Sequence, residues 1–267
     1  MLKSMISIQL PVNDYAFLVD STPEIEMHLL NKFHPFVLTT DKDAKYKLFL
    51  KTTNNSLTIY NNDHQILSTK ETTSDFDSYK LIIAVLRDTT IAKNDQCIMH
   101  GSYIDFRGKG ILLLGESGAG KSTLSAFLST KEMVKCYADD IVIVDQNEEV
   151  RCLSKYLYLR KPSTLLEGLS NVSYVYDDFL QRFSMKLSNT EEKKKIDEIF
   201  ILMRDNNNNV PYMQNDPNPL TTLLHNMYLP CSIRSNFAIA ARLASRKSVR
   251  QLHYYDLESV YDFLKNV

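Results

Sequence analysis

Glycine is rare in this chain, and nearly all of it lies in one short stretch. Only 7 of the 267 residues are glycine, whereas ordinary usage would give about 19. Collagen-like and glycine-linker classes are therefore excluded. Because glycine permits positive φ angles and close backbone approach, a cluster of glycines predicts a tightly folded backbone with a specific task. The glycines that make up the cluster are Gly101, Gly108, Gly110, Gly115, Gly118 and Gly120, and only Gly168 lies elsewhere.

Part of the cluster forms a phosphate-loop motif. The sequence GESGAGKS, Gly115–Ser122, matches G-x-x-x-x-G-K-[ST]. It follows the apolar run Ile111–Leu114 and precedes a helix expected from Lys121 to about Thr130, which is the strand–loop–helix context that the motif requires. Backbone N–H groups and the helix N-terminus would hold the phosphates of a nucleoside triphosphate. The residues expected at the nucleotide are Gly115, Glu116, Ser117, Gly118, Ala119, Gly120, Lys121, Ser122 and Thr123.

The acid that holds the metal ion at this site could be one of an adjacent pair of aspartates or a third aspartate further along the chain. Lys121 can reach the β- and γ-phosphates, and the Ser122 hydroxyl can ligate Mg²⁺ together with an acid. We expect a strand over Val134–Ala138 beside Ile111–Leu114 that ends at Asp139-Asp140. Ligands bind at the carboxyl ends of such strands, which favours this pair. Asp145 is the alternative, but it would lie at the far end of a returning strand, and the pair itself could be two turn carboxylates.

His100 is a further candidate. It lies on a strand expected over Cys97–Phe106, which a turn at residues 107–110 joins to the strand before the phosphate loop. This position could bring the imidazole close to the terminal phosphate. A lone histidine on an apolar strand is also often an ordinary core residue, so the residues alone leave both interpretations open.

Together these elements resemble the HPr kinase/phosphorylase family. The order is His100-Gly101, then GESGAGKS, then Ala138-Asp139-Asp140, with Asp139 18 residues beyond Lys121. The closing stretch VRQLHYYDLESVYDFL also looks like the end of related proteins. The resemblance implies an α/β fold: a P-loop catalytic domain related to phosphoenolpyruvate carboxykinase, after a small α+β N-terminal domain. It further implies transfer of phosphate from ATP to a serine hydroxyl, with His100 near the phosphates, Ser122 and one aspartate at Mg²⁺, and an aspartate as base.

One departure from the family narrows the implied substrate. The family signature E-I-R-G-L-G-I is absent after the acidic pair, and the nearest stretch is YLRKPSTLLEGL, Tyr158–Leu169. This argues against phosphorylase activity and against HPr as the substrate. The compact chain looks more like the related enzymes, lasso-peptide kinases among them, that phosphorylate a serine of a ribosomally made precursor peptide. A small-molecule kinase and a non-catalytic nucleotide-binding regulator are the competing hypotheses.

A cation that stabilises the transition state would have to come from further along the chain. Arg182 is the candidate that we favour, with Arg160-Lys161 as an alternative, although each could be an ordinary surface residue. A basic cluster could grip an acidic peptide or simply be a solvated helix end. Its members are Arg242, Arg246, Lys247 and Arg250.

The chain is expected to form two domains. Residues 1–95 predict a small α+β domain, which could recognise the substrate, and residues 96–267 predict the catalytic domain. In the first, short strands precede a helix over Asp75–Ala92. In the second, Glu191–Lys195 is expected on a solvated helix face. The remaining expected elements are strands Met5–Leu10, Phe36–Leu38, Tyr46–Leu50, Leu57–Tyr60, Gln65–Leu67, Tyr156–Leu159, Ile199–Met203 and Val249–Tyr254, and helices Leu220–Leu229, Phe237–Ser245 and Asp256–Val267.

Charge and cysteine content limit the classes of partner and the cellular compartment that the sequence favours. With 31 basic and 32 acidic residues the net charge is −1, which gives no reason to expect nucleic acid or an anionic membrane as partner. No apolar run approaches the length that spans a bilayer, and the N-terminus lacks a signal-peptide core. The 4 cysteines lie far apart, which favours the reducing cytoplasm. The sequence leaves open whether the protein forms a homo-oligomer.

Overall fold

The computed structural model describes residues 6–9, 15–33, 37–38, 46–53, 55–61, 63–91, 96–152, 156–160, 174–188, 194–205, 210–228 and 233–266. The chain divides into two compact units, Met1–Lys93 and Asn94–Val267. Each has several buried strands of its own, and each is described by itself. No helix in these described ranges is both long and apolar enough to cross a membrane.

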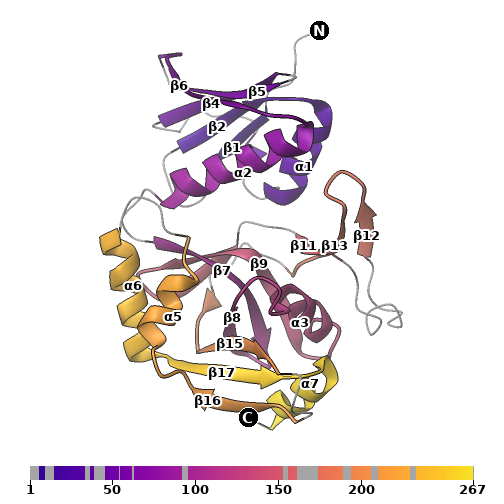
Figure 1. Ribbon diagram of the computed structural model, residues 1–267, viewed down its shortest axis with the longest axis vertical. Helices are drawn as coiled ribbons and strands as arrows, with labels where there is room; N and C mark the ends of the chain where they lie inside the picture. The colour runs from indigo at the N-terminus through magenta and orange to yellow at the C-terminus, as the bar shows by residue number, and fades with distance from the viewer. Residues whose placement is uncertain are drawn as a thin grey trace. The chain divides into compact units, whose positions relative to one another are not determined.

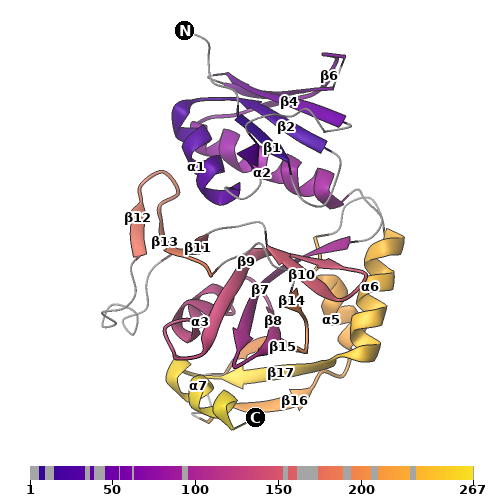
Figure 2. The same ribbon diagram turned by 180° about the vertical axis from the view of Figure 1, so that it is seen from behind.

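The first unit is one mixed sheet with two helices on the same side of it (Figures 1 and 2). The strand order is β3-β1-β2-β4-β5-β6. Only β2 and β4 pair in parallel; the other pairings are antiparallel. The elements are β1 (Ile6–Gln9), β2 (Tyr15–Asp20), α1 (Pro23–Phe33), β3 (Val37–Leu38), β4 (Tyr46–Thr53), β5 (Ser56–Tyr60), β6 (Ile66–Glu71) and α2 (Asp75–Ile91).

The expected helix α2 and the short strands of this unit are present, but β2 and α1 were not expected from the sequence. Both have recognisable signals. The run that forms β2 is almost wholly buried from Ala16 to Val19. Helix α1 has Pro23 in its first turn with Glu24 and Glu26 beside it, which is a favourable start for a helix.

The second unit is built on an eight-stranded mixed sheet with the order β14-β10-β9-β7-β8-β15-β17-β16. Strands β8, β15 and β17 are parallel to one another, and the other pairings are antiparallel. The strands are β7 (Gln96–Phe106), β8 (Lys109–Leu114), β9 (Val134–Asp145), β10 (Glu149–Cys152), β14 (Lys194–Lys195), β15 (Glu198–Arg204), β16 (Tyr212–Asn215) and β17 (Ser248–Tyr254).

Helices cover both faces of this sheet, so the unit has three layers (Figure 1). Alternate residues of a strand point to opposite faces. Leu113 packs in a core with residues of α3 (Lys121–Leu128) and α7 (Leu257–Lys265). Its neighbours Leu112 and Leu114 pack with residues of α5 (Pro219–His225) and α6 (Ile233–Arg246). The unit is therefore α/β, as expected, with β8 buried at its centre.

Strand β9 corrects the expectation for the acidic pair. The sequence suggested two strands separated by a turn at Asp139-Asp140, the first beside β8. Instead one strand runs from Val134 to Asp145 and pairs with β7 along its whole length. It can do so because the long strand β7 uses both edges, one for β8 and one for β9. The pair therefore lies in mid-strand, where Asp140 takes a positive φ of 67°.

A separate three-stranded sheet accounts for part of the segment after β10. Its order is β11-β13-β12, with β11 (Tyr156–Leu159), β12 (Tyr174–Asp177) and β13 (Arg182–Lys186). The expected helix face at Glu191–Lys195 is wrong where the structure describes it, because Lys194 and Lys195 form β14. Their strand pairs with β10, and Lys195 O accepts a hydrogen bond from the Tyr103 hydroxyl (2.7 Å). Glu191 lies outside the described residues.

Candidate active site

The loop between β8 and α3 depends on glycine at three positions. Gly115, Gly118 and Gly120 have φ of +141°, +90° and +92°, a region that other residues rarely adopt. Gly120 is also the residue that precedes α3. A side chain on Gly120 would overlap the hydroxyl of Tyr254, so both conformation and space select glycine there. The first turn of α3 consequently presents its free N–H groups at the loop.

Lys121 is folded back into this loop. Its Nζ donates hydrogen bonds to the carbonyl oxygens of Gly115 (2.7 Å) and Glu116 (3.0 Å), and the residue is only 7% exposed. Burial lowers the pKa of the Lys121 ammonium, and the charges of Asp139 and Asp140 act against that shift. A cation is thus held inside the loop at the N-terminus of a helix, which is an arrangement that can bind an anion.

Tyr254, at the end of β17, holds the other side of the loop. Its hydroxyl donates to the Ala119 carbonyl oxygen at 2.5 Å, and the side chain is 3% exposed. Burial raises the pKa of this phenol, so the hydroxyl stays a donor. This contact could not be predicted from the sequence, because it joins residues that are 135 positions apart.

Asp139 points to the start of α3. Its carboxylate accepts a hydrogen bond from the Ser102 hydroxyl. Burial raises the pKa of Asp139 to about 6, with a further contribution from the charge of Asp140, while the side chains of Ser102 and Ser122 oppose the shift. The structure therefore brings Asp139 close to Ser122 of α3, although β9 is not adjacent in the sheet to β8, the strand that leads into α3. Ser102 was not predicted.

Asp140 differs from Asp139 in its exposure. Its side chain is 52% exposed, and its Oδ1 lies 3.7 Å from His100 Nε2. The His100 side chain is 35% exposed and its ring lies 5.8 Å from that of Tyr228, so it is not a fully buried core histidine. Burial lowers the pKa of His100, Lys121 adds to this, and Asp140 opposes it. The imidazole is therefore neutral near pH 7.

The other sequence candidates lie apart from this group in the described part of the chain. Arg182 begins β13, opposite Asp177 in the three-stranded sheet, and no contact in the described ranges joins it to the loop. Arg160 is exposed after β11, and Lys161 falls outside the described residues. Asp145 accepts hydrogen bonds from the N–H groups of Asn147 and Glu149, so it orders the turn after β9.

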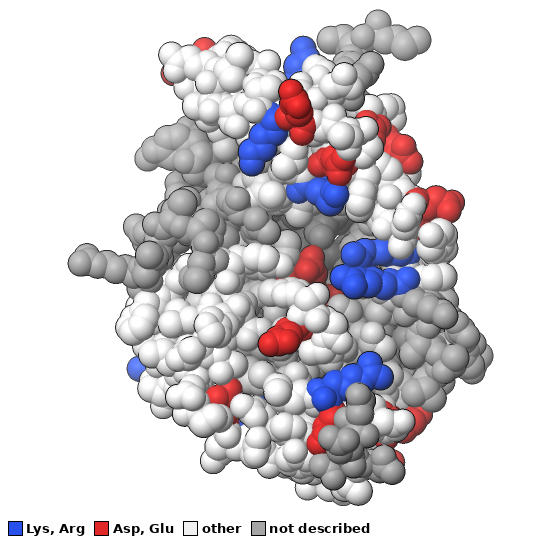
Figure 3. Space-filling model, in the orientation of Figure 1, with Lys and Arg blue, Asp and Glu red and all other residues white. Residues whose placement is uncertain are grey.

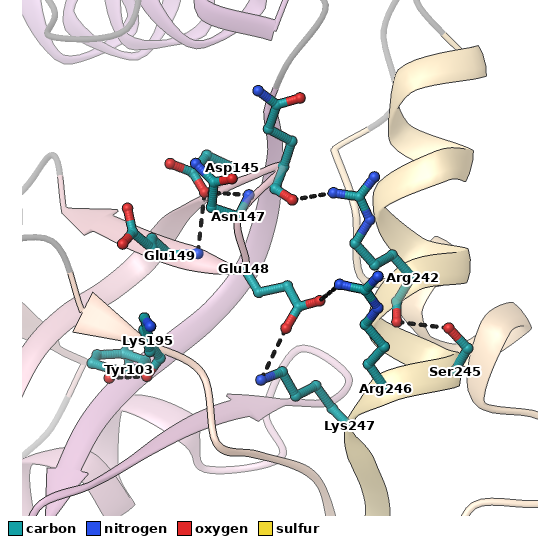
Figure 4. A network of polar contacts seen from close by, with 11 residues as sticks. Tyr103, Asp145, Asn147, Glu148, Glu149, Lys195, Arg242, Ser245, Arg246 and Lys247 are labelled. Atoms are coloured by element: carbon teal, nitrogen blue, oxygen red, sulfur yellow. Dashed lines mark hydrogen bonds and ion pairs between the residues drawn. The ribbon is translucent and has the colours of Figure 1, made fainter.

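The basic cluster is largely engaged in internal contacts (Figure 4). Arg246 and Lys247 both form ion pairs with Glu148, at 3.4 and 2.9 Å. Arg242 donates to the Gln146 carbonyl, and Arg250 pairs with Glu198 on the neighbouring strand. These contacts join α6 and β17 to the rest of the sheet, so a structural role explains the cluster better than peptide binding does.

Ser122 and Asp139 offer the oxygen ligands that Mg²⁺ prefers. Within the described ranges no group of three or more His, Cys, Asp or Glu side chains could by itself hold a metal ion. A divalent ion at Ser122 and Asp139 would consequently need phosphate oxygens and water to complete its coordination, which is usual for Mg²⁺ at a nucleotide.

Comparison with known proteins gives weak homology to one family. No family model matches the sequence. The HPr kinase/phosphorylases of Cupriavidus necator and Cupriavidus metallidurans are each 26% identical over 176 residues, which cover 62% of this chain and 49% of the relative. The chain thus matches about half the length of these curated relatives. A solved HPr(Ser) kinase/phosphatase from Coxiella burnetii gives a TM-score of 0.31 at 12% identity, over 63% of this chain and 94% of that chain.

Proposed function

We propose that this protein is a kinase that transfers the γ-phosphate of ATP to a serine hydroxyl of a peptide or protein. One observation carries the proposal: the buried carboxylate of Asp139 lies close enough to the side chain of Ser122, in the first turn of α3, for the two to interact. Lys121 lies inside the adjoining loop, and Asp140 lies beside Asp139. The weak homology to HPr kinase/phosphorylases supports the same activity.

The two aspartates differ in a way that suggests separate roles. Asp139 is buried and lies close to the side chain of Ser122, so we assign it, with Ser122, to Mg²⁺. Bound there, the ion would stabilise negative charge on the phosphate oxygens. Asp140 is half exposed and can meet an incoming hydroxyl, so we assign it as the base.

In the proposed transfer, Asp140 accepts the proton of the acceptor's serine hydroxyl while the serine oxygen forms a bond to the γ-phosphorus. The bond from that phosphorus to the bridging oxygen breaks, and ADP leaves with the electron pair. Lys121 counters the charge of the β- and γ-phosphates, and neutral His100 can donate a hydrogen bond near the terminal phosphate. Arg182 remains the sequence-based candidate for a further cation.

The proposal also concerns the molecule that accepts the phosphate. The absence of the family's E-I-R-G-L-G-I signature favours a substrate other than HPr, and we propose a serine of a ribosomally made precursor peptide, recognised through the N-terminal unit. Cys97 and Cys136 are buried and neither forms a disulfide, which agrees with the reducing cytoplasm that we propose as the location.

The test is incubation with ATP labelled at the γ-phosphate, Mg²⁺, and serine-containing peptides, with HPr as a further acceptor. Label should appear on serine with the wild-type protein, and the variants Asp139→Asn and Asp140→Asn should lose at least about a hundredfold of this activity. Label found only on small metabolites would contradict a peptide or protein kinase. Nucleotide binding without transfer, with both variants retaining biological activity, would instead identify a regulator.

A further inference from the structure

The turn after α5 lies at the point where the phosphate loop begins. Three residues, Asn226–Tyr228, run along the edge of β7. His100 N–H donates to the Asn226 carbonyl oxygen (2.8 Å) and Tyr228 N–H donates to that of Ile98 (2.9 Å), with a bridge between Met99 and Met227. Strand β8 pairs with β7 only from Ser102 onward. The turn therefore occupies the edge of β7 that β8 leaves when it enters the loop.

The side chain of Asn226 reaches the first residue of the loop. Its Oδ1 accepts a hydrogen bond from Gly115 N–H (3.0 Å), and its Nδ2 donates to the Thr222 carbonyl (2.9 Å). The second bond orients the carboxamide so that its oxygen faces the loop. The Gly115 carbonyl oxygen in turn accepts from Lys121. One residue thus contacts the loop through its side chain and the His100 strand through its backbone.

We propose that Asn226 is a positioning residue, which sets the start of the phosphate loop in register with His100 and the acids on β9. The expected effect on turnover rests on the proposed kinase function. The hydrogen bonds that Asn226 accepts from Gly115 and His100 are observed in the structure and do not depend on that function. A displacement of reacting groups by about 1 Å can lower the reaction rate about a hundredfold. A residue that joins the phosphate loop to the His100 strand should therefore act mainly on kcat.

Three variants separate this role from a general effect on folding. Asn226→Ala removes the bond to Gly115 and is expected to lower kcat about tenfold or more, while the Kd for MgATP changes by less than about threefold because the loop N–H groups and Lys121 remain. Asn226→Asp keeps an acceptor for Gly115 and should recover much of kcat. Its added negative charge should weaken MgATP binding, less so at high salt. Asn218→Ala, at the other end of α5 where the side chain makes no capping bond, should match wild type.

A second measurement does not depend on activity. Labelling with ¹⁵N-glycine gives a spectrum with at most 7 glycine signals. The Gly115 amide should exchange slowly with solvent in wild type and in Asn226→Asp, and much faster in Asn226→Ala. Gly108 and Gly110, whose N–H groups bond to the side chains of Asp105 and Asp197, should exchange alike in all variants.

The outcomes can be told apart. If Gly115 stays protected in Asn226→Ala, or loses protection while kcat is unchanged, the positioning role is wrong. If MgATP does not shift the signals of Gly118 and Gly120 in the wild-type protein, the proposed kinase function fails, and the exchange of Gly115 still decides whether Asn226 holds the loop.

Discussion

At the scale of single residues, the site is defined by two adjacent carboxylates in unlike surroundings. Asp139 is 4% exposed and accepts a hydrogen bond from Ser102, whereas the side chain of Asp140 is 52% exposed. Neighbours on a strand point to opposite faces in regular structure. The positive φ of Asp140 interrupts that regularity, and this local distortion accompanies the placing of both acids near Lys121.

The buried acid should reduce the stability of the metal-free protein. Burial raises the pKa of Asp139 from 3.8 to about 6. Between these values the folded state holds a proton that the unfolded chain has lost, so the free energy of unfolding falls as pH rises through this window. Asp139→Asn should therefore be more stable than wild type at pH 8, by about 1–3 kcal/mol. The advantage should disappear near pH 4.

Urea denaturation at the two pH values, without metal or nucleotide, measures this difference. Asp140→Asn is the comparison variant and should change the stability at pH 8 less than Asp139→Asn does, because its side chain is half exposed and its charge is a smaller cause of the raised Asp139 pKa than burial is. A variant Asp139→Asn that was less stable than wild type at pH 8 would contradict the prediction.

At the scale of elements, the loop is held from both sides by secondary structure that lies far away in sequence. Tyr254 at the end of β17 contacts Ala119, and Asn226 after α5 contacts Gly115. The parallel order of β8, β15 and β17 makes the first contact possible, because it brings the carboxyl ends of these strands to one edge. The loop conformation is therefore a property of the assembled sheet.

This dependence predicts a rescue between two substitutions. A Cβ on Gly120 would overlap the Tyr254 hydroxyl, but would lie 3.6 Å from the ring carbon Cζ, an ordinary contact. Gly120→Ala should accordingly lower the Tm and weaken nucleotide binding, and adding Tyr254→Phe should restore part of both. The remaining loss reflects the positive φ, about 1 kcal/mol or more, together with the missing hydrogen bond from Tyr254 to Ala119.

Gly118→Ala is the control, since Gly118 has a similar φ of +90° but nothing within 4 Å of a Cβ. Its Tm should fall less than that of Gly120→Ala, and Tyr254→Phe should not improve it. Equal effects of Tyr254→Phe on both alanine variants would show that the steric argument is wrong.

At the scale of the whole molecule, neither sign of charge predominates on the face that Figure 3 shows. Figure 3 shows Lys and Arg interspersed with Asp and Glu on one face, amid mostly uncharged atoms. This agrees with a net charge of −1. The two units Met1–Lys93 and Asn94–Val267 each bury their own apolar residues, and every residue of the candidate site belongs to the second.

We therefore predict that residues 94–267 expressed alone fold and bind MgATP with a Kd within about threefold of that of the full chain. If the N-terminal unit recognises the acceptor, the KM for a peptide should rise while the Kd for MgATP stays the same. Calorimetric titration and circular dichroism measure binding and folding. An unfolded fragment, or one that does not bind MgATP, would show that the second unit depends on the first.

Much of the candidate site could be predicted from local sequence, because its signals are short-range. The motif Gly115–Ser122 carries its own backbone requirements, and the apolar run before it predicts a buried strand. His100 and the acidic pair were candidates on residue type and order alone. The strand arrangement expected for the acidic pair was wrong, since β9 is one strand paired with β7 along its whole length.

The sequence by itself thus determined which residues could meet a phosphate, because the motif Gly115–Ser122 places glycines, a lysine and a serine at fixed spacing between an apolar run and a helix. Only the tertiary structure decided which partners hold that loop in place. Ser102, Asn226 and Tyr254 act through hydrogen bonds to residues 37, 111 and 135 positions away. Such contacts depend on strand order and register, which are set by the packing of two cores on opposite faces of one sheet.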